Sequence, residues 1–549
     1  MAPAPAFADV SGELDGGKIA PAANAQKSAE TAASGGYAIE MWDTSSVELK
    51  VTNLTATVAY KIRARQEICG AAAAQMTVKI DGAAAGTYTV ANTTYQDFSV
   101  AGNWAAGEHL VHVDFVNPYF QADCIARELW LDKVTAVSPG RTYYVDRTAA
   151  AGGTGLSSTS AWNSLDTVKD AALTPGDTVL FKAGQTWTNA NLIISRPGTA
   201  AATITFGSYG TGAAPIFDGG GNHHPIDISA DARFVTVQDV QVRNAGDSDQ
   251  VGLAVSGKDV LVQRVTATGN AIGVQAYDDA DRLRVTASVL SNNRTVINPD
   301  GLGADEESSD DYGANGAVVL AAAGVRIDHN TINGNYGPSA DFDYDGSAVE
   351  VYGAVDLTVD HNTATDNQTF SELGDSRTSN AWFFDNVITT SASFSAGQVI
   401  GINLQGGGEF GVVHGTKVTN NTFVLRNPEA GALVVGAGAD ARFQNNIVQA
   451  DSAGYTNGQR IDEGHNVYYN WTYIDGMLSS DNTSADGGIA PSSTTANPLF
   501  VSGTDFHLQT GSPAKNRGAD AYTVTTDRDD LPRVFGASVD AGAYERQTA

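Results

Sequence analysis

The chain has 549 residues, more than one compact core usually holds, so two or more modules with a large buried core are expected. Glycine is abundant at 59 residues and methionine scarce at 4, a composition that favours strands and turns over long helices. The formal net charge of −30 argues against nucleic acid and anionic lipid as partners and makes a neutral polymer the easier one, unless the acidity only keeps the protein soluble.

The first residues and the cysteines bear on location. No run of about 18 apolar residues is present, so no transmembrane helix is expected. The start MAPAPAFADV shows no signal peptide and suits the mature form of a secreted protein. Cys69 and Cys124 are the only cysteines, and a single pair indicates one disulfide rather than a metal site, with two buried free thiols as the alternative.

The first part of the chain changes character at residue 37. Residues 1–36 are rich in Ala, Gly, Pro and Ser without periodicity, which predicts a linker or tail. Residues 37–137 carry short alternating strands separated by polar or Gly turns, which predicts an antiparallel β-sandwich. SPGR at 138–141 is a short hinge. The predicted strands are VELKVT, VAYKIRAR, MTVKIDG, YQDFSV, HLVHVDFV and ELWLDKVTAV.

The end of this module, HLVHVDFVNPYFQADCIARELWLDKVTAV, resembles the calcium-dependent carbohydrate-binding modules, particularly those that bind xylan. In that family a strand ending in Phe and Asn leads to a loop with Asp and then to a Leu-x-x-Asp strand. Pro118 departs from the pattern, because family members often carry an acidic residue there, and Cys-Ile-Ala interrupts the run after Asp123. The matching residues are Phe115, Asn117, Asp123 and the run from Leu129 to Asp132.

The resemblance implies a calcium ion as cofactor, and no organic cofactor is indicated. Oxygen donors crowd this loop, which suits a hard cation that takes about six to eight oxygen ligands. The expected ligands are Asp114, Asn117 and Asp123, with Cys124 tying the loop to the strand of Cys69. The alternative is an accessory sandwich with a merely polar loop.

Internal repeats dominate residues 141–549. Eight segments share a template of alternating apolar positions, an Asn near a turn and another short strand, at intervals of about 20 to 37 residues. No helical segment separates them, so a parallel β-solenoid is predicted rather than βαβ units. The segments are VTVQDVQVRNAG, VLVQRVTATGN, LRVTASVLSNN, VRIDHNTINGN, LTVDHNTATDN, AWFFDNVITT, KVTNNTFVLRN and ARFQNNIVQAD.

The recurring asparagines are interpreted as structural. An interior amide at a turn can bond the backbone of its own and neighbouring coils, and Asn tolerates the left-handed conformation that a turn requires. The predicted ladder consists of Asn293, Asn330, Asn362, Asn386, Asn421 and Asn446.

The flanks of the repeats resemble right-handed parallel β-helix proteins of the pectate-lyase-like superfamily. YYVDRTAAAGGTG, PGDTVLFKAGQTW and ITFGSYGTGAAPIFDG are similar to the opening coils, and NPLFVSGTDFHLQTGSPAKNRG with VDAGAYE is similar to the closing coil. The resemblance covers about residues 141–546. It implies the fold and leaves the reaction open, since the fold hosts lyases, hydrolases, epimerases and binding proteins.

A second strand precedes each Asn-containing turn and carries the predicted chemistry. Aligned on the asparagines, these strands stack polar side chains in the central coils and apolar ones at the ends. Adjacent coils lie about 4.8 Å apart, so Glu350 and Glu372 are predicted to be neighbouring carboxylates of which one should have a raised pKa. The predicted column is Ala254, Gln275, Asn315, Glu350, Glu372, Asn403 and Val434.

This pair suits a glycoside hydrolase, in which one carboxyl protonates the leaving oxygen and the other attacks or activates water. Asp345, Asp310 and Asp311 are further catalytic candidates from the preceding turns. Aromatic walls are expected from Tyr312, Tyr344, Tyr352, Phe370 and Trp382. The residues expected to bind substrate are Asn315, Asn403, Gln405, Asp375, Arg377 and Tyr352.

Two alternatives remain open. A polysaccharide lyase would use Ca²⁺ against a uronate carboxylate and a base such as Arg377, His361, His414 or Lys417. A non-catalytic glycan-binding β-helix would carry the acids as a calcium site or a solvated face. The favoured prediction is a secreted hydrolase of a largely neutral polysaccharide with an appended glycan-binding module.

Overall fold

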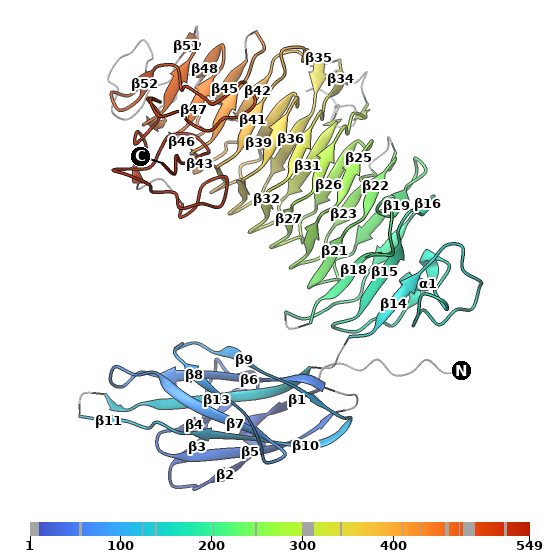
Figure 1. Cartoon of the computed structure of the whole chain (residues 1–549), viewed down its shortest axis with the longest axis vertical. Helices are drawn as coiled ribbons and strands as arrows, with labels where there is room; N and C mark the ends of the chain where they lie inside the picture. The colour runs from blue at the N-terminus through green and yellow to red at the C-terminus, as the bar shows by residue number, and fades with distance from the viewer. Residues whose placement is uncertain are drawn as a thin grey trace. The chain divides into compact units, whose positions relative to one another are not determined.

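The computed structural model divides the chain into two compact units (Figure 1). One comprises residues 1–141, 172–177 and 198–204, and the other residues 142–171, 178–197 and 205–549. Among the described residues, no helix is long and apolar enough to cross a membrane. The structure describes residues 10–53, 57–122, 124–137, 140–200, 202–246, 250–298, 312–340, 343–408, 410–428, 430–455, 461–470, 473–475, 489–520 and 524–548.

The first unit is a sandwich of two antiparallel sheets. One sheet has the order β3 (Ala25–Ala29), β4 (Tyr37–Met41), β13 (Glu128–Val137), β6 (Thr57–Glu67) and β9 (Gln96–Trp104), with β1 (Val10–Glu13) pairing with β13. The other has the order β2 (Lys18–Ala20), β5 (Ser45–Asn53), β10 (Gly107–Phe115), β7 (Ala74–Ile80) and β8 (Ala83–Val90). The antiparallel sandwich predicted from alternation is therefore confirmed.

Residues 10–36 correct the prediction of a tail that runs to residue 36. They form β1, the 3₁₀ turn η1 (Leu14–Gly16), β2 and β3, all within the sandwich. Leu14 and Ala25 are buried in its core. Strands β2 and β3 are largely exposed, so their sequences KIA and AQKSA carry few apolar residues and resemble a low-complexity linker.

The second unit is a right-handed parallel β-helix, as predicted. Each coil contributes one strand to each of three parallel sheets, so the sheets run the length of the solenoid (Figure 1). The first sheet is β14 (Thr142–Val145), β15 (Thr178–Lys182), β18 (Ile204–Tyr209), β21 (Val235–Gln238), β24 (Leu261–Gln263), β27 (Arg284–Thr286), β32 (Arg326–Asp328), β37 (Thr358–Asp360), β40 (Trp382–Phe384), β43 (Thr416–Thr419), β46 (Ala441–Gln444) and β49 (Asp462–Gly464).

The other two sheets continue each coil. The second sheet is β16 (Thr186–Thr188), β19 (Ile216–Asp218), β22 (Gln241–Arg243), β25 (Thr266–Thr268), β28 (Val289–Ser291), β33 (Thr331–Asn333), β38 (Thr363–Thr365), β41 (Val387–Thr389), β44 (Thr422–Val424), β47 (Ile447–Gln449), β50 (Val467–Tyr469) and β52 (Thr494–Thr495). The third sheet is β17 (Leu192–Ile194), β20 (Ile226–Ile228), β23 (Leu253–Val255), β26 (Ile272–Ala276), β31 (Asn315–Leu320), β36 (Ser347–Tyr352), β39 (Thr369–Gly374), β42 (Ile400–Leu404), β45 (Gly431–Val435), β48 (Ser452–Tyr455) and β51 (Tyr473–Asp475).

Few elements lie outside these sheets. Helix α1 (Leu165–Asp170) follows the first strand of the solenoid, and Ser164 caps it by accepting a hydrogen bond from the Thr167 amide. Three short hairpins project from longer loops: β11 (Phe120–Gln121) with β12 (Ile125–Ala126) in the sandwich, and β29 (Val296–Ile297) with β30 (Tyr312–Gly313) and β34 (Gly337–Ser339) with β35 (Asp343–Asp345) in the β-helix.

The turn between the first and second sheets contains the predicted asparagine ladder, here called the first-turn ladder. In each coil the side-chain oxygen accepts the backbone N–H of the preceding coil's asparagine, at 2.9 Å between Asn330 and Asn362 and 3.0 Å between Asn362 and Asn386. The left-handed residue of the turn is the one before the ladder asparagine, such as His361 with φ 54°. The ladder consists of Asn330, Asn362, Asn386, Asn421, Asn446 and Asn466.

Asn293 is not part of this ladder. It belongs to a second-turn ladder on the way to the third sheet, in which Asn270, Asn293, Asn335 and Asn367 are joined in the same manner. The two ladders lie five residues apart in sequence, as Asn330 and Asn335 show, so an alignment on one asparagine per repeat merges them. Both ladders are buried and structural, in agreement with the prediction.

Alternation along the third sheet positions the candidate site. In β36 the side chains of Val349 and Val351 are buried in the solenoid, whereas Glu350 and Tyr352 are only half-buried. Strand β39 repeats the pattern with Ser371 and Leu373 buried and Glu372 half-buried. Successive side chains of a strand point to opposite faces, so both glutamates lie on the outer face of the third sheet.

Candidate functional site

Two glutamates occupy one register position on neighbouring strands of the third sheet. Glu350 in β36 pairs with Glu372 in β39, and Glu372 pairs with Asn403 in β42. Adjacent parallel strands are about 4.8 Å apart, so the two carboxylates are next-door neighbours on an outward face. The full row, here called the outward row, is Ala254, Gln275, Val318, Glu350, Glu372, Asn403 and Val434.

The placement of Asn315 in this row is wrong. Val318 pairs with Glu350, and Asn315 lies three residues earlier, at the first position of β31 opposite Ile272. A shift of three residues moves a side chain to the other face of a strand. Asn315 nevertheless reaches the site, because its buried side-chain amide donates a hydrogen bond to Glu350 Oε2.

Neutral donors surround Glu372. The Gln405 amide donates to Glu372 Oε1 at 2.8 Å, and the Tyr352 hydroxyl lies 3.4 Å from the same oxygen. Gln405 follows β42 and Tyr352 ends β36, so the residues that orient Glu372 come from the coils on either side of it. Each glutamate therefore contacts at least one amide donor from a neighbouring coil.

Tyr352 forms an aromatic edge of the site. Its ring lies against Gly374, where a Cβ would come within 2.3 Å of a ring carbon, so a glycine is needed for this close approach. Phe410 lies beyond it, with ring centroids 6.4 Å apart. Burial raises the pKa of Tyr352 far above its usual range, and the negative charges of Glu350 and Glu372 raise it further. Tyr352 is therefore a hydrogen-bond donor at neutral pH.

Of the remaining acidic candidates, one lies at the site and two lie outside the described residues. Asp345 ends β35, accepts the Gly346 amide at 2.7 Å, and is close enough to contribute to the raised pKa of Tyr352. Asp310 and Asp311 lie outside the described residues. Of the three additional carboxylates, only Asp345 is therefore placed beside the glutamates.

Asp375 and Arg377 form an exposed ion pair just after β39. The Arg377 guanidinium approaches Asp375 through Nε at 3.1 Å, while 64% of its side chain remains exposed. The hydrogen bond from Arg377 lowers the pKa of Asp375. Asn403 is half-buried and makes no side-chain hydrogen bond to any residue in the described ranges. These three predicted substrate-binding residues are thus accessible at the downstream end of the site.

The aromatic surroundings differ from the expectation. Phe370 is buried in the solenoid against Phe383, and Trp382 lies on the first sheet between Thr358 and Lys417. Neither residue contributes to the surface of the site, because Phe370 points into the solenoid and Trp382 lies on a different sheet.

The predicted Tyr344 belongs to an aromatic cluster around Tyr336, a residue that sequence reasoning missed, in the loops that lead into β31, β36 and β42. Tyr336 is packed by Arg294 at 4.3 Å, by Phe394 at 5.1 Å between ring centroids, and by Tyr344 at 6.1 Å. These residues come from the loops of three coils, those of β31, β36 and β42, with no repeat signal to mark them. Together with Tyr352 and Phe410, they place aromatic rings near both ends of the strands that carry the glutamates.

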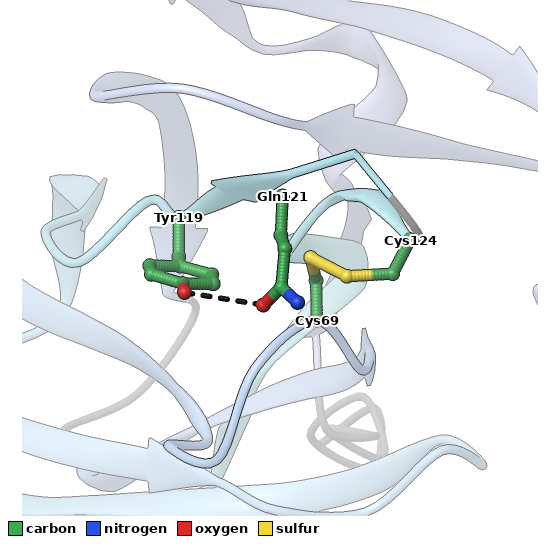
Figure 2. Close-up of a disulfide and its surroundings, with 4 residues drawn as sticks. All are labelled: Cys69, Tyr119, Gln121 and Cys124. Atoms are coloured by element: carbon green, nitrogen blue, oxygen red, sulfur yellow. Dashed lines mark hydrogen bonds between the residues drawn. A yellow bond between two sulfur atoms is a disulfide. The ribbon is translucent and has the colours of Figure 1, made fainter.

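The sandwich has a second candidate site at its disulfide. Cys69 and Cys124 are bonded, with Cα atoms 5.5 Å apart, as predicted. Figure 2 shows Tyr119 and Gln121 beside the disulfide on the same side of the short β11 ribbon, with the Tyr119 hydroxyl 3.2 Å from the Gln121 side-chain oxygen. The disulfide closes a loop with a sequence separation of 55 residues, which stabilises this region by about 4 kcal/mol in the chain-entropy model.

Of the predicted calcium ligands, the structure describes Asp114 and Asn117, and both already make hydrogen bonds to protein groups. Asp114 bonds Lys79 Nζ at 2.9 Å and His112 Nε2 at 2.9 Å, so Lys79 is its cationic partner. Burial alone would raise the pKa of Asp114, but the hydrogen bonds from Lys79 and His112 outweigh it and lower that pKa.

Asn117 is committed to the backbone. Its side-chain oxygen accepts the Gln75 amide at 2.6 Å and its side-chain nitrogen donates to the Ala73 oxygen at 2.8 Å. Its own carbonyl accepts Arg127 Nη1 at 2.8 Å, which brings a guanidinium into the loop. Asp123 lies outside the described residues. Asp114 thus forms an ion pair with Lys79, and Asn117 holds its loop against the backbone of residues 73–75.

Exposed apolar side chains gather around the same disulfide. Ile125 is 81% exposed and has a left-handed φ of 66°, a strained conformation for a β-branched residue. A concentration of exposed apolar side chains marks an interaction surface. The patch consists of Ile68, Val116, Tyr119, Phe120 and Ile125.

Family comparisons support both parts of the chain. Residues 59–143 match a calcium-dependent carbohydrate-binding module that binds xylan, and residues 219–448 match a right-handed β-helix region. The resemblances seen in the sequence are thereby confirmed, and the chain is a β-helix protein with a carbohydrate-binding module. No curated protein matches the chain.

Solved structures also match parts of this chain at low identity. The pectate lyase Pel9A is 16% identical over 74% of this chain and 97% of its own, with a TM-score of 0.49. The GH136 lacto-N-biosidase from Eubacterium ramulus is 15% identical over 65% of this chain and 68% of its own, with a TM-score of 0.44. The carbohydrate-binding module CBM36 in complex with calcium and xylotriose is 13% identical over 23% of this chain and 96% of its own, with a TM-score of 0.19.

Proposed function

We propose that the protein is a secreted glycoside hydrolase that cleaves a largely neutral polysaccharide with Glu350 and Glu372. The observation that carries the proposal is the pairing of these residues at one register position on the outer face of adjacent strands. Two carboxylates side by side are costly for a fold and are the arrangement that glycosidic cleavage requires. The disulfide fits a protein of an oxidising compartment.

The roles follow from the neighbours of each glutamate. Gln405 and Tyr352 direct hydrogen-bond donors at one oxygen of Glu372, which orients this carboxyl group. We assign Glu372 the attack on the anomeric carbon and Glu350 the delivery of a proton to the leaving oxygen. Adjacent coils are about 4.8 Å apart, closer to the carboxyl separation of about 5–5.5 Å in retaining enzymes than to that of inverting ones. Retention of configuration is therefore expected.

The same surroundings weigh against a lyase. Proton abstraction next to a uronate needs a base at the site, but His361 lies in the first turn, where it bonds Asp360, and His414 lies just before β43 of the first sheet, where it bonds Asp440. Lys417 lies over Trp382 on the first sheet. Tyr352 is beside the glutamates, but burial raises its pKa too far for a base at neutral pH. Only Arg377 remains, and it is paired with Asp375.

The sandwich is proposed to bind the polymer near the disulfide. Tyr119 and Phe120 offer exposed aromatic rings there, and Gln121 offers an amide, the kinds of groups that stack on sugar rings and bond their hydroxyls. This binding would raise the local concentration of substrate for the β-helix. The family match makes xylan the first polymer to test.

The test is a panel of neutral and uronate-containing polysaccharides incubated with the full chain. We would record new reducing ends together with the near-ultraviolet absorbance of the unsaturated sugar that β-elimination produces. Reducing ends without that chromophore are the expected result. A chromophore that grows in step with the reducing ends would replace the hydrolase by a lyase, and binding without any product would leave a glycan-binding protein.

A further inference from the structure

A cavity of about 300 Å³ lies away from the glutamates, beside the second sheet of the β-helix. It is bounded on one side by the ends of β47 and β50 and on the other by residues 497–509, which return along the solenoid after its last coils. Its volume is at the lower limit of ordinary small-molecule sites. The lining includes Arg426, Gln449, Tyr469, Asn497, Phe500 and Gln509.

The lining has an unusual charge for this chain. In a protein with a net charge of −30, none of the residues that line the cavity in the described part of the chain is acidic, and one, Arg426, is cationic. The guanidinium of Arg426 is held in place by the carbonyls of Thr390 and Gly503, each at 2.8 Å. Two of its five N–H groups are used in this way, which leaves donors on a fixed, exposed fork.

Amide side chains extend the polar lining. Gln449 is half-buried and its amide makes no hydrogen bond to the residues that the structure describes. Gln509 donates to the Phe500 carbonyl at 2.7 Å, which leaves its side-chain oxygen as an acceptor. Gln449 and Tyr469 occupy one register position on adjacent coils, so an amide and an aromatic ring lie side by side.

We propose that this cavity binds a single carboxylate-bearing sugar unit, a uronic acid. The carboxylate would take the bidentate fork of Arg426, the hydroxyls would bond Gln449 and Gln509, and the ring would lie against Tyr469 or Phe500. The site lies on the second sheet, whereas the glutamates lie on the third, so it is a separate subsite. It suits an acidic substituent or terminal unit on an otherwise neutral polymer.

The experiment compares two monosaccharides that differ only at the group in question. Binding of D-glucuronate and of D-glucose to the full chain would be measured by saturation-transfer NMR, in low and in high salt. The expected affinity for glucuronate is at least about tenfold higher, because a charge-assisted hydrogen bond contributes about 1.5–3 kcal/mol. High salt should reduce this difference.

Variants locate the binding. R426Q and Q449L are expected to weaken glucuronate binding at least about tenfold and a few-fold respectively. The control is R442Q, which removes an exposed arginine on the first sheet that pairs with Asp462. R426Q also removes the hydrogen bond to the Gly503 carbonyl and could disturb the loop. Q449L removes no such bond, so it tests the cavity without that side effect. Equal binding of the two sugars, no binding of either, or unchanged binding in both variants would overturn the proposal, and no outcome depends on catalytic turnover.

Discussion

The β-helix contains two kinds of polar stack, and they differ in what they can do for the fold. In the first-turn ladder every asparagine both donates and accepts, so each coil satisfies the next and the stack is buried. The outward row places Glu350 beside Glu372, and two carboxyl groups side by side cannot form a self-complementary stack as amides do. They depend on donors from elsewhere, namely Asn315, Gln405 and Tyr352.

This difference distinguishes a polar stack that folding alone explains from one that it does not. A self-complementary amide stack gains stability with every coil added, so selection for folding alone accounts for it. In a pair of half-exposed carboxylates, neither side chain stabilises the other, so folding alone does not account for the pair. The following predictions test whether the two stacks divide stability and activity between them.

The largest expected effect is on activity in E350Q and E372Q. Each substitution removes one carboxylate and retains the shape of the side chain, so hydrolysis of the preferred polymer should fall about 10²- to 10⁴-fold. The unfolding midpoint should stay the same or rise, because the repulsion between neighbouring carboxylates is removed. Initial rates and thermal unfolding measure the two effects. The control is E108Q, at an exposed glutamate of the sandwich.

A folded E350Q or E372Q protein with full activity would contradict the assignment of the acid pair. An equal loss in E108Q would mean that the assay reports binding or stability rather than chemistry. Inversion of the anomeric configuration in the product, seen by NMR, would remove the nucleophilic role of Glu372 and leave it as a base that activates water.

The first-turn ladder should show the opposite pattern in N362A. The side chain of Asn362 accepts from Asn330 and donates to the Ile327 carbonyl at 2.8 Å, so its loss leaves buried backbone groups unpaired. We expect a loss of about 2–5 kcal/mol in unfolding free energy, measured in urea. N403A, in the outward row, should cost less than about 1 kcal/mol. Equal losses would show that both rows are structural.

The sequence predicted the ladder more accurately than the site. Repetition every coil makes Asn330, Asn362 and Asn386 visible, because the same backbone geometry demands the same residue each time. The merging of Asn293 into that ladder arose because both turns use asparagine. The register of Glu350 and Glu372 was also recoverable from the sequence. Glu350 precedes Asn362 by nearly as many residues as Glu372 precedes Asn386.

The missed features share one physical cause, which is contact between segments that no repeat relates. Asn315 is the exception, because spacing alone would have placed Val318 in the row: Val318 stands as many residues before Asn330 as Glu350 stands before Asn362. The pairing of Asp114 with Lys79 depends on adjacent strands of the sandwich that the sequence does not align. Tyr336 and Phe394 meet through loops of different coils, and only the folded chain brings them together.

Asp385 lies in the first turn of the β-helix, next to the asparagine ladder. It tests what a carboxylate costs the fold in the place where asparagines stabilise it. It is fully buried beside Arg533, and burial raises its pKa to about 7 although Arg533 and His361 act to lower it. A folded-state pKa above the unfolded value means that the stabilisation is complete below about pH 4 and is lost as the pH rises to about 7.

The measurement compares D385N with the wild type across that pH range. The amide introduced by this substitution cannot ionise, so the unfolding free energy of the variant should improve relative to wild type as the pH rises. The gain should be a few kcal/mol, on the order of 1.4 for each unit of the pKa shift. D356N is the matched control, because Asp356 is also in a left-handed turn, with φ 56°, but is exposed. A constant difference between D385N and wild type would mean that Asp385 stays ionised against Arg533.

The smallest effect is expected from R377A, at the exposed pair beside the outward row. The pair with Asp375 is solvated, and exposed ion pairs contribute about 0–1 kcal/mol, so stability should hardly change. If Arg377 only contacts the polymer, KM should rise less than about fivefold and kcat should be unchanged, because the interaction is equal in the ground and transition states. A collapse of kcat to the level of E372Q would instead place Arg377 in the chemistry. That is the role a lyase base would require, so this exposed arginine decides whether the carboxylate pair acts alone.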